Sequence, residues 1–283
     1  MHPYDVARFL GLATIWSFQY IFLRVAVPEF GIGAVADSRA IFGALVLIPA
    51  ALAMGQRIGP LEHWKDHLAV SLVNNVLPFA CFAYAASALP AAYLSILNGL
   101  VPLWTAVFAA WVLHEPLGPR RSAGFVLGMV GVALIVQLGP IALDTRTVLA
   151  TLVAVLGAAA WGYAGVMIKQ RTGKLPPIGL AAGSIAFSAL IMSPLLATAP
   201  KPSWGLEATA SLIGLGALCS GVSYLAFFTL VRDIGPSRTL AVGFLVPVLG
   251  ILWGWLILDE AVTLPMLGGA ALVLFAMALV LKR

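Results

Sequence analysis

Apolar runs of about 20 residues follow one another along the chain, separated by short stretches that hold charges, prolines and glycines. A helix of about 20 residues crosses the roughly 30 Å apolar core of a bilayer. The pattern therefore predicts an all-α polytopic membrane protein with ten transmembrane helices. The expected helices cover residues 6–26, 32–54, 67–88, 90–114, 119–138, 147–170, 176–198, 207–231, 236–258 and 264–281.

Two parts of this division into helices do not follow from the positions of charged residues. The first run follows Arg8, as in a cleaved signal sequence, but it is too long and the second follows too closely, so we interpret it as a retained helix. No charge lies between the third and fourth runs, where Pro90 and the total length predict the break.

The composition agrees with a membrane protein. Of the 283 residues, 61% are hydrophobic and 10% are charged, whereas about a quarter are charged in soluble domains. The two cysteines, Cys81 and Cys219, lie inside apolar runs and are interpreted as small packing residues. No metal site, disulfide or cofactor is expected.

The basic residues predict an orientation and need no nucleic-acid partner. With the N-terminus in the cytoplasm, twelve of the 16 Lys and Arg residues lie inside, three (Arg24, Arg146 and Lys201) lie outside, and Arg39 lies within the second run. The positive-inside rule therefore predicts an inner (plasma) membrane protein with both termini cytoplasmic. The twelve are Arg8, Arg57, Lys65, Arg120, Arg121, Lys169, Arg171, Lys174, Arg232, Arg238, Lys282 and Arg283.

A shift of 145 or 146 residues aligns the chain with itself and predicts two repeats, 1–140 and 141–283. Each repeat holds five helices, an odd number, so the second enters the membrane in the opposite direction. Such inverted repeats are typical of secondary transporters, which bind substrate between the repeats near mid-membrane. Aligned pairs include Trp16 with Trp161, Pro90 with Pro236, Pro102 with Pro247 and Glu115 with Glu260.

Three segments resemble the ten-helix, EamA-domain branch of the drug/metabolite transporter superfamily. They are Thr14-Ile15-Trp16 through Arg24, Leu100-Val101-Pro102 leading to Leu113-His114-Glu115-Pro116-Leu117, and Gly124-x-x-x-Gly128-x-x-Gly131. Within the family, the chain is most similar to YddG-type aromatic amino-acid exporters. The resemblance implies alternating access between inverted bundles and leaves the substrate open.

Polar and aromatic side chains near the middle of the predicted helices are the candidate substrate-binding residues, because polar groups are costly there. The alternatives are interface anchoring, ordinary packing and hydrogen bonding between helices. The candidates are Trp16, Gln19, Tyr20, Asn74, Asn75, Phe79, Tyr84, Tyr93, Asn98, Trp161, Tyr163, Ser223 and Tyr224, with Phe82 and Ser220 at similar depth.

Prolines predict unpaired carbonyl groups beside these candidates. Pro78 leaves the carbonyl of Asn74 without its α-helical partner, and Pro102 does the same to Asn98. Such carbonyls can receive the ammonium group of an amino acid, while Trp and Tyr rings can stack on an aromatic side chain or a cation. A ligand with one polar and one flat apolar end would fit this lining.

Acidic residues are missing from the middle of the predicted helices. Asp37 lies near the outer end of the second, where we expect Arg39 or Arg24 to pair with it. Glu115 and Glu260 are expected to cap helices near the membrane surface. Small four-helix relatives bind protons on a glutamate in their first helix, where this chain has Gln19. We therefore expect facilitated efflux, with proton coupling as the alternative.

Small residues at four-residue spacing, as in Gly124-x-x-x-Gly128 and Gly250-x-x-x-Gly254, allow helices to approach closely. We expect them to pack within one bundle, so that the protein is a monomer, with a dimer as the alternative.

The sequence thus predicts a transporter that exports small amphipathic metabolites, most of all aromatic or large apolar amino acids. Cationic drugs, purines and sugar conjugates are alternative substrates. An intramembrane enzyme is the alternative from another class, but the chain has no zinc-protease, nucleophile-elbow or phosphate-loop motif. The expected partners are the substrate and the lipid bilayer.

Overall fold

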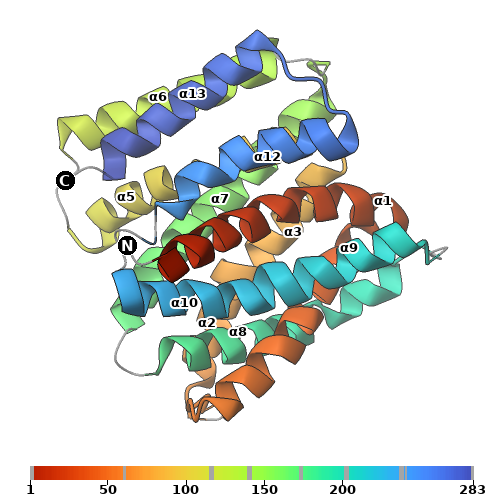
Figure 1. Ribbon diagram of the computed structural model, residues 1–283, viewed down its shortest axis with the longest axis vertical. Coiled ribbons are helices and arrows are strands. Elements are labelled where there is room, and N and C mark those ends of the chain that lie inside the picture. Colours follow the sequence, from red (N-terminus) through yellow and green to blue (C-terminus); the bar gives the residue numbers. More distant parts are fainter. Residues whose placement is uncertain are drawn as a thin grey trace.

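A computed structural model describes residues 3–59, 62–114, 118–138, 142–171, 175–200, 204–235, 239 and 241–281. The regular elements of this part of the chain are all helices, lying side by side in one bundle (Figure 1). They are α1 (Pro3–Ala53), α2 (Trp64–Val70), η1 (Ser71–Val76), α3 (Leu77–Ala86), α4 (Ala91–Asn98), α5 (Val101–Val112), α6 (Pro119–Leu138), α7 (Thr145–Arg171), α8 (Pro177–Met192), η2 (Ser193–Thr198), α9 (Leu206–Gly216), η3 (Ala217–Val222), α10 (Ser223–Ile234), α12 (Val242–Leu258) and α13 (Leu264–Leu281).

Six helical stretches of the described residues are long and apolar enough to cross a membrane. They are Tyr4–Ala53, Trp64–Ala86, Ala91–Val112, Thr145–Gln170, Pro177–Thr198 and Leu206–Ile234, and two shorter apolar helices cover Val242–Leu258 and Leu264–Val280. The prediction of an all-helical polytopic membrane protein is therefore confirmed.

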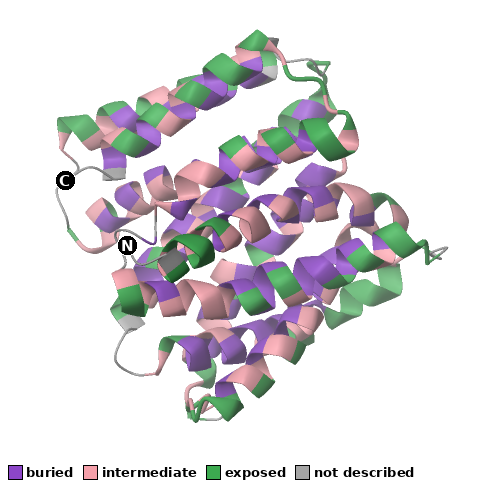
Figure 2. Ribbon diagram, in the orientation of Figure 1, coloured by how far each residue is buried: buried purple, intermediate pink, exposed green. Residues whose placement is uncertain are grey.

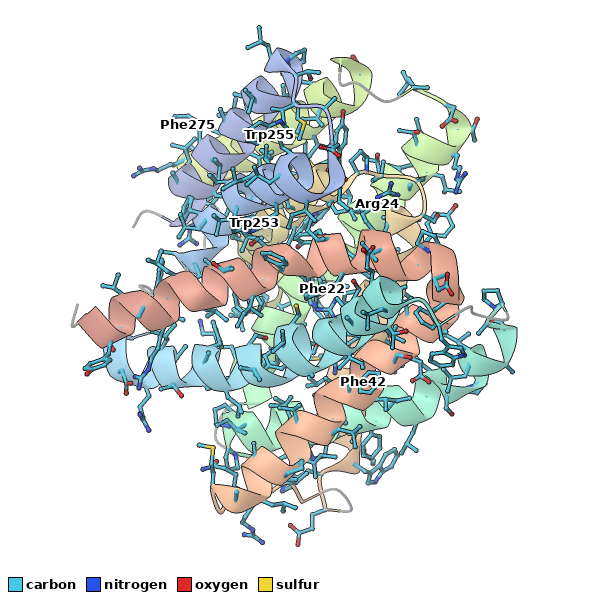
Figure 3. All side chains as sticks on the ribbon, turned by 45° about the vertical axis from the view of Figure 1, so that its right-hand side comes forward. Phe22, Arg24, Phe42, Trp253, Trp255 and Phe275 are labelled. Atoms are coloured by element: carbon cyan, nitrogen blue, oxygen red, sulfur yellow. The ribbon has the colours of Figure 1, made fainter. Side chains whose placement is uncertain are left out.

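Large apolar side chains point outward from the bundle, as expected where lipid is the solvent. Trp255 on α12 and Phe275 on α13 are both exposed, and Phe275 lies at the edge of the bundle in Figure 3. Buried residues follow the faces where helices meet (Figure 2). Cys81 and Cys219 are among them as free thiols, which agrees with a packing role.

The first two predicted helices form one element, α1, which bends at Gly31 instead of ending in a loop. Gly31 has φ 77° and ψ 162°, a conformation that side chains disfavour, and this single residue redirects the helix. A Cβ atom at this position would lie 2.9 Å from Cδ of Pro200. Figure 3 shows the two halves of α1 running in different directions, and the second half packs against α8 and α9.

The third and eighth predicted helices are interrupted by matching π-helical turns. In one, η1 joins α2 to α3, and in the other, η3 joins α9 to α10. The two turns begin at Ser71 and Ala217 and end at Val76 and Val222, so both boundaries differ by the 146 residues that align the sequence with itself. Turns of this kind occur frequently at functional sites.

The predicted helix over 90–114 is divided in the structure. Pro90 is the N-cap of α4, and a turn at Gly99 and Leu100, whose backbone angles stay in the right-handed helical region, separates α4 from α5. Pro102 explains the interruption, because it has no N–H to donate to the carbonyl of Asn98. The helix also ends earlier than expected, at Val112.

Helix ends near the bundle surface are capped by acidic residues. Asp144 accepts a hydrogen bond from the backbone N–H of Thr147 at 2.7 Å, at the start of α7, and this bond holds the pKa of Asp144 below its usual range. Glu260 follows α12 and accepts bonds from the N–H groups of Ala91 at 2.6 Å and Ala92 at 3.0 Å, at the start of α4. The capping role predicted for Glu260 is confirmed, while Glu115 lies outside the described residues.

Candidate substrate-binding site

The centre of the bundle holds a buried arginine, Arg39, on the second half of α1. Only 4% of Arg39 is exposed. Its Nε donates a hydrogen bond to Oγ of Ser220 in η3 at 2.9 Å, and its Nη2 donates one to Oε1 of Gln19 on the first half of α1 at 2.8 Å. Arg39 thus connects both halves of α1 with the π-helical turn η3.

Aromatic rings surround this guanidinium group. Its Cζ lies 4.0 Å from the ring centroid of Phe79 and 6.0 Å from that of Trp161. The Trp161 ring stacks on Phe82 at 4.9 Å, and Phe82 in turn lies 6.0 Å from Tyr20. These rings come from α1, α3 and α7 and form an apolar wall beside a cation.

The η1 turn adds amide groups to this cluster. The Nδ2 of Asn74 donates hydrogen bonds to Oδ1 of Asn75 at 3.0 Å and to the hydroxyl of Tyr224 on α10 at 3.2 Å. The Nε1 of Trp161 on α7 donates to the backbone carbonyl of Asn74 at 2.9 Å. We call the resulting set the central cluster: Gln19, Tyr20, Arg39, Asn74, Asn75, Phe79, Phe82, Trp161, Ser220 and Tyr224.

Seven of the predicted candidates therefore lie in the central cluster, and the other six do not. Trp16 packs on Phe227 with ring centroids 5.5 Å apart, Tyr163 packs on Phe108 at 5.3 Å, and the hydroxyl of Tyr93 donates to the carbonyl of Ile135 at 3.3 Å. Ser223 donates to the carbonyl of Cys219 within its own helix at 2.7 Å. Tyr84 and Asn98 are half-buried on α3 and α4.

The expected pairing of Asp37 with Arg39 or Arg24 was wrong. Arg39 bonds Gln19 and Ser220, and Arg24 donates to the carbonyl of Ala86 at 2.8 Å. Both carboxylate oxygens of Asp37 are buried and have no hydrogen-bond partner among the described residues. Asp37 and Arg39 are two residues apart on one helix, so their side chains point in different directions.

The expected availability of the Asn74 carbonyl was also wrong. Pro78 does deny this carbonyl its α-helical partner, but the indole N–H of Trp161 takes that place. The carbonyl is therefore engaged within the protein and is not free to receive an ammonium group in this conformation.

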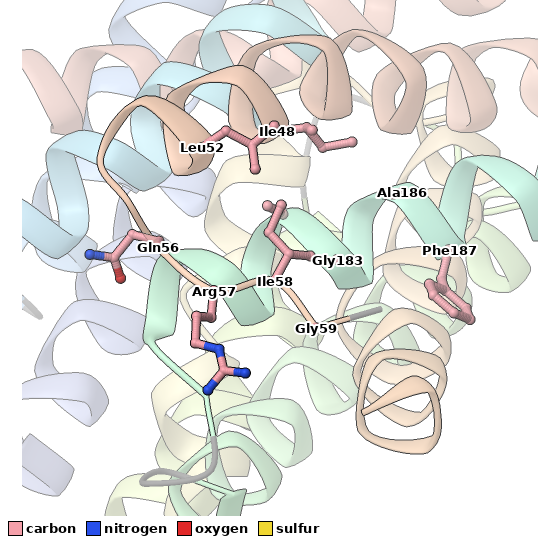
Figure 4. Close-up of a pocket in the computed structure, with 10 residues that line it drawn as sticks. Ile48, Leu52, Gln56, Arg57, Ile58, Gly59, Gly183, Ala186 and Phe187 are labelled. Atoms are coloured by element: carbon pink, nitrogen blue, oxygen red, sulfur yellow. The ribbon is translucent and has the colours of Figure 1, made fainter. Parts of the chain in front are cut away.

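The central cluster is closed in this conformation. Gln19, Tyr20, Arg39, Asn75, Phe79, Phe82 and Ser220 are all buried. A pocket of about 460 Å³ lies elsewhere, between the C-terminal end of α1, residues 56–59 and α8 (Figure 4). Its lining, which includes Leu52, Arg57 and Phe187, contains no residue of the central cluster. Access to Arg39 therefore requires movement of helices.

Arg39 is a member of the central cluster that the sequence interpretation did not include among the candidates. It was treated as a charge within the second predicted helix and as a partner for Asp37, although a charged residue inside a membrane helix usually has a functional reason. Its position inside the apolar run 32–54 was the signal that distinguished it from the other basic residues.

Comparison with known proteins identifies the family. The sequence profile of the EamA-like transporter family matches this chain twice, over residues 6–137 and 148–282. The chain belongs to this family. Because its members are transporters, the family agrees with the prediction of a protein that is not an enzyme, and it confirms the broader resemblance inferred from the sequence.

Individual relatives of this EamA-like chain are distant but match over nearly its full length. It is 23% identical to an uncharacterized transporter, YoaV, of Bacillus subtilis over 93% of this chain and 92% of the relative. It is also 23% identical to a probable terminal-alkyne amino-acid exporter of Streptantibioticus cattleyicolor over 95% and 90%. A solved crystal structure with 20% identity covers 99% of this chain and 96% of its own, with a TM-score of 0.66, and shares the fold.

Proposed function

We propose that this EamA-family transporter exports small amphipathic metabolites, and that amino acids with aromatic or large apolar side chains are its substrates. The observation that carries this proposal is the central cluster, in which aromatic rings from both halves of the chain lie beside amide groups of the first half. Stacked rings such as Trp161 and Phe82 offer a flat apolar surface beside polar groups. An aromatic amino acid has the same division between a flat ring and a polar end.

Alternating access of two inverted five-helix repeats, 1–140 and 141–283, is the proposed mechanism. Two observations support the repeats: the family profile matches each half separately, and the π-helical turns η1 and η3 are related by 146 residues. The bonds from Trp161 to Asn74 and from Asn74 to Tyr224 join the halves at the centre. Movement of one half against the other would break these bonds and open the cluster.

The proposed location is the inner membrane with both termini in the cytoplasm. The start of α1 and the end of α13 lie at the same end of the bundle (Figure 1), as ten crossings require. The sequence-based topology assigns twelve of the 16 basic residues to the cytoplasmic side, which supports this orientation. The proposed form is a monomer.

Among alternative substrates, cationic drugs are disfavoured by Arg39, because a buried positive charge repels a cation at short distance. The similarity to a probable terminal-alkyne amino-acid exporter of Streptantibioticus cattleyicolor favours amino acids over purines and sugar conjugates.

Flux through liposomes that contain only this protein tests the proposal. We expect release of labelled phenylalanine and tryptophan down their gradients, and a loss of flux in Trp161→Ala. Trp111→Ala is the matched control, because Trp111 is exposed on the outer surface of α5. Movement of other solutes without phenylalanine or tryptophan would refute the substrate class, and equal flux in Trp161→Ala and Trp111→Ala would remove Trp161 from the site.

A further inference from the structure

We infer that Arg39 binds the carboxylate group of the transported solute. This inference rests on the proposed function and identifies the chemical group that the central cluster recognises. It begins from the charge of Arg39, which no anion among the described residues neutralises. The two hydrogen-bond acceptors of its guanidinium, Oε1 of Gln19 and Oγ of Ser220, are both uncharged.

A buried cation without a counter-ion is costly inside a membrane protein, and such groups usually mark a ligand or ion path. The rings of Phe79 and Trp161 offset part of this cost through cation–π contacts, each of which contributes only about 0.5–2 kcal/mol. Asp37 provides no neutralisation, because it makes no ion pair with Arg39. An anionic ligand would supply the missing charge.

Two buried nitrogen atoms of the central cluster that lack hydrogen-bond partners among the described residues point to the same class of ligand. Arginine has five N–H donors in a planar fork, and the Nη1 group of Arg39 is buried with no hydrogen-bond partner in the part of the chain that the structure describes. The Nδ2 of Asn75, in the η1 turn, is likewise buried without one among these residues. Both atoms are donors, so the complementary ligand offers acceptors. A carboxylate offers two oxygens that match the guanidinium fork.

The surroundings orient the guanidinium for this role. Bonds to Gln19 and Ser220 fix the Nη2 and Nε sides of Arg39, while the Phe79 ring covers one face at 4.0 Å. The Nη1 side is left for a ligand. The neighbouring stack of Trp161 on Phe82 would then hold the apolar part of the same molecule. Analogues in which the carboxylate is replaced by an amide or is absent would leave Arg39 without an anionic partner and bind poorly.

A series of phenylalanine analogues tests this inference on the intact protein in liposomes. The measurement is inhibition of labelled phenylalanine counterflow by unlabelled phenylalanine, 3-phenylpropionate, phenylalaninamide and 2-phenylethylamine. We expect the two carboxylates to inhibit, and the amide and amine to inhibit at least about 30-fold more weakly, the discrimination typical of a buried charge pair. Equal inhibition by phenylalanine and phenylalaninamide would overturn the inference while leaving the proposed function intact.

Substitution of Arg39 gives a second, independent measurement. Arg39→Met keeps length without charge, and we expect it to bind phenylalanine and phenylalaninamide with equal, weak affinity, whereas Arg39→Lys retains part of the preference for the carboxylate. Arg57→Met is the control, because Arg57 is an exposed arginine outside the central cluster. A preference that survives unchanged in Arg39→Met would refute the inference. If Arg39→Met does not fold, the analogue series on the unaltered protein decides.

The outcomes also separate this inference from the proposed function. If no amino acid with an aromatic or large apolar side chain moves but another carboxylate such as butyrate moves, with loss in Arg39→Met, the proposed substrate class is wrong and the inference stands. If no carboxylate moves or raises the melting temperature of the protein, the inference is wrong, whatever other solutes are transported.

Discussion

The indole N–H of Trp161 donates a hydrogen bond to the backbone carbonyl of Asn74, with 2.9 Å between Nε1 and the oxygen. Pro78 creates the opening for this bond, because it has no N–H to occupy the carbonyl four residues before it. A tryptophan in the second half of the chain thus supplies the hydrogen bond that a proline in the first half removes. The bond lies next to Arg39, which is 6.0 Å from the Trp161 ring.

Replacing Trp161 by Phe is expected to destabilise the protein and reduce phenylalanine flux. The variant keeps an aromatic ring for stacking on Phe82 but loses the donor to the Asn74 carbonyl. Loss of one partner of a buried hydrogen bond costs about 1–3 kcal/mol. Thermal unfolding in detergent micelles measures the effect on stability.

The variant Pro78→Ala provides the control for this bond. It restores a backbone N–H that can bond the Asn74 carbonyl, so Trp161→Phe should cost less in the Pro78→Ala background than alone. Such a double-mutant cycle isolates the coupling between the two residues. Additive effects would show that the proline and the tryptophan do not share this carbonyl.

The sequence predicted the bounds of the helices better than it predicted which side chains contact one another. Runs of apolar residues located α6 and α13 closely, because bilayer thickness fixes helix length. Gly31 could not be recognised as a bend within one helix, since glycine at the end of an apolar run equally predicts a loop. Its role depends on a positive φ angle, which only the structure supplies.

The candidate site could be predicted only in part, for a related reason. Asn74 and Trp161 were found because polar and aromatic groups are unusual at mid-membrane depth. Their depth did not distinguish them from Trp16, which packs on Phe227 instead. The direction of a side chain around its helix decides between these outcomes, and a helix that is apolar on every face gives no periodicity from which to read it.

Asp37→Asn is expected to leave the protein at least as stable as the unaltered chain. The carboxylate of Asp37 is buried, and neither oxygen has a hydrogen-bond partner among the described residues; burial of an unpaired charge is more costly than burial of a neutral amide of similar shape. The apparent melting temperature in detergent measures this. A clear fall in Asp37→Asn would mean that the carboxylate has a stabilising partner.

Flux is expected to follow the amino-acid gradient alone, without coupling to protons. The central cluster contains no acidic residue, and Asp37 is not bonded to any member of it. A pH gradient imposed on liposomes should therefore not drive accumulation of labelled phenylalanine, and Asp37→Asn should transport at the rate of the unaltered protein. Accumulation driven by the pH gradient and lost in Asp37→Asn would place proton coupling at Asp37.

Removal of the Glu260 carboxylate is expected to loosen the start of α4. Glu260 accepts bonds from the backbone N–H groups of Ala91 and Ala92, which have no partner within the helix. Loss of a side-chain cap costs about 0.5–2 kcal/mol, so Glu260→Ala should lower the melting temperature. Glu62→Ala, at an exposed glutamate that pairs with Arg57 at 3.8 Å, should have little effect; equal losses in both variants would contradict the capping role.

Small residues lie where α6 meets α13. Their substitution tests whether the spaced glycines allow helices of one chain to pack closely. A Cβ atom at Gly131 would lie 2.8 Å from the backbone oxygen of Gly269 on α13, which cannot yield as a flexible side chain would. Gly131→Ala is therefore expected to destabilise the monomer by about 1–3 kcal/mol. Gly268, beside Gly269 on the same helix, has open space where its Cβ would be, and Gly268→Ala should raise stability slightly because alanine favours helices over glycine. Thermal unfolding combined with light scattering measures both variants. A change from dimer to monomer in Gly131→Ala, without loss of stability, would instead assign this glycine to an interface between two copies of the chain.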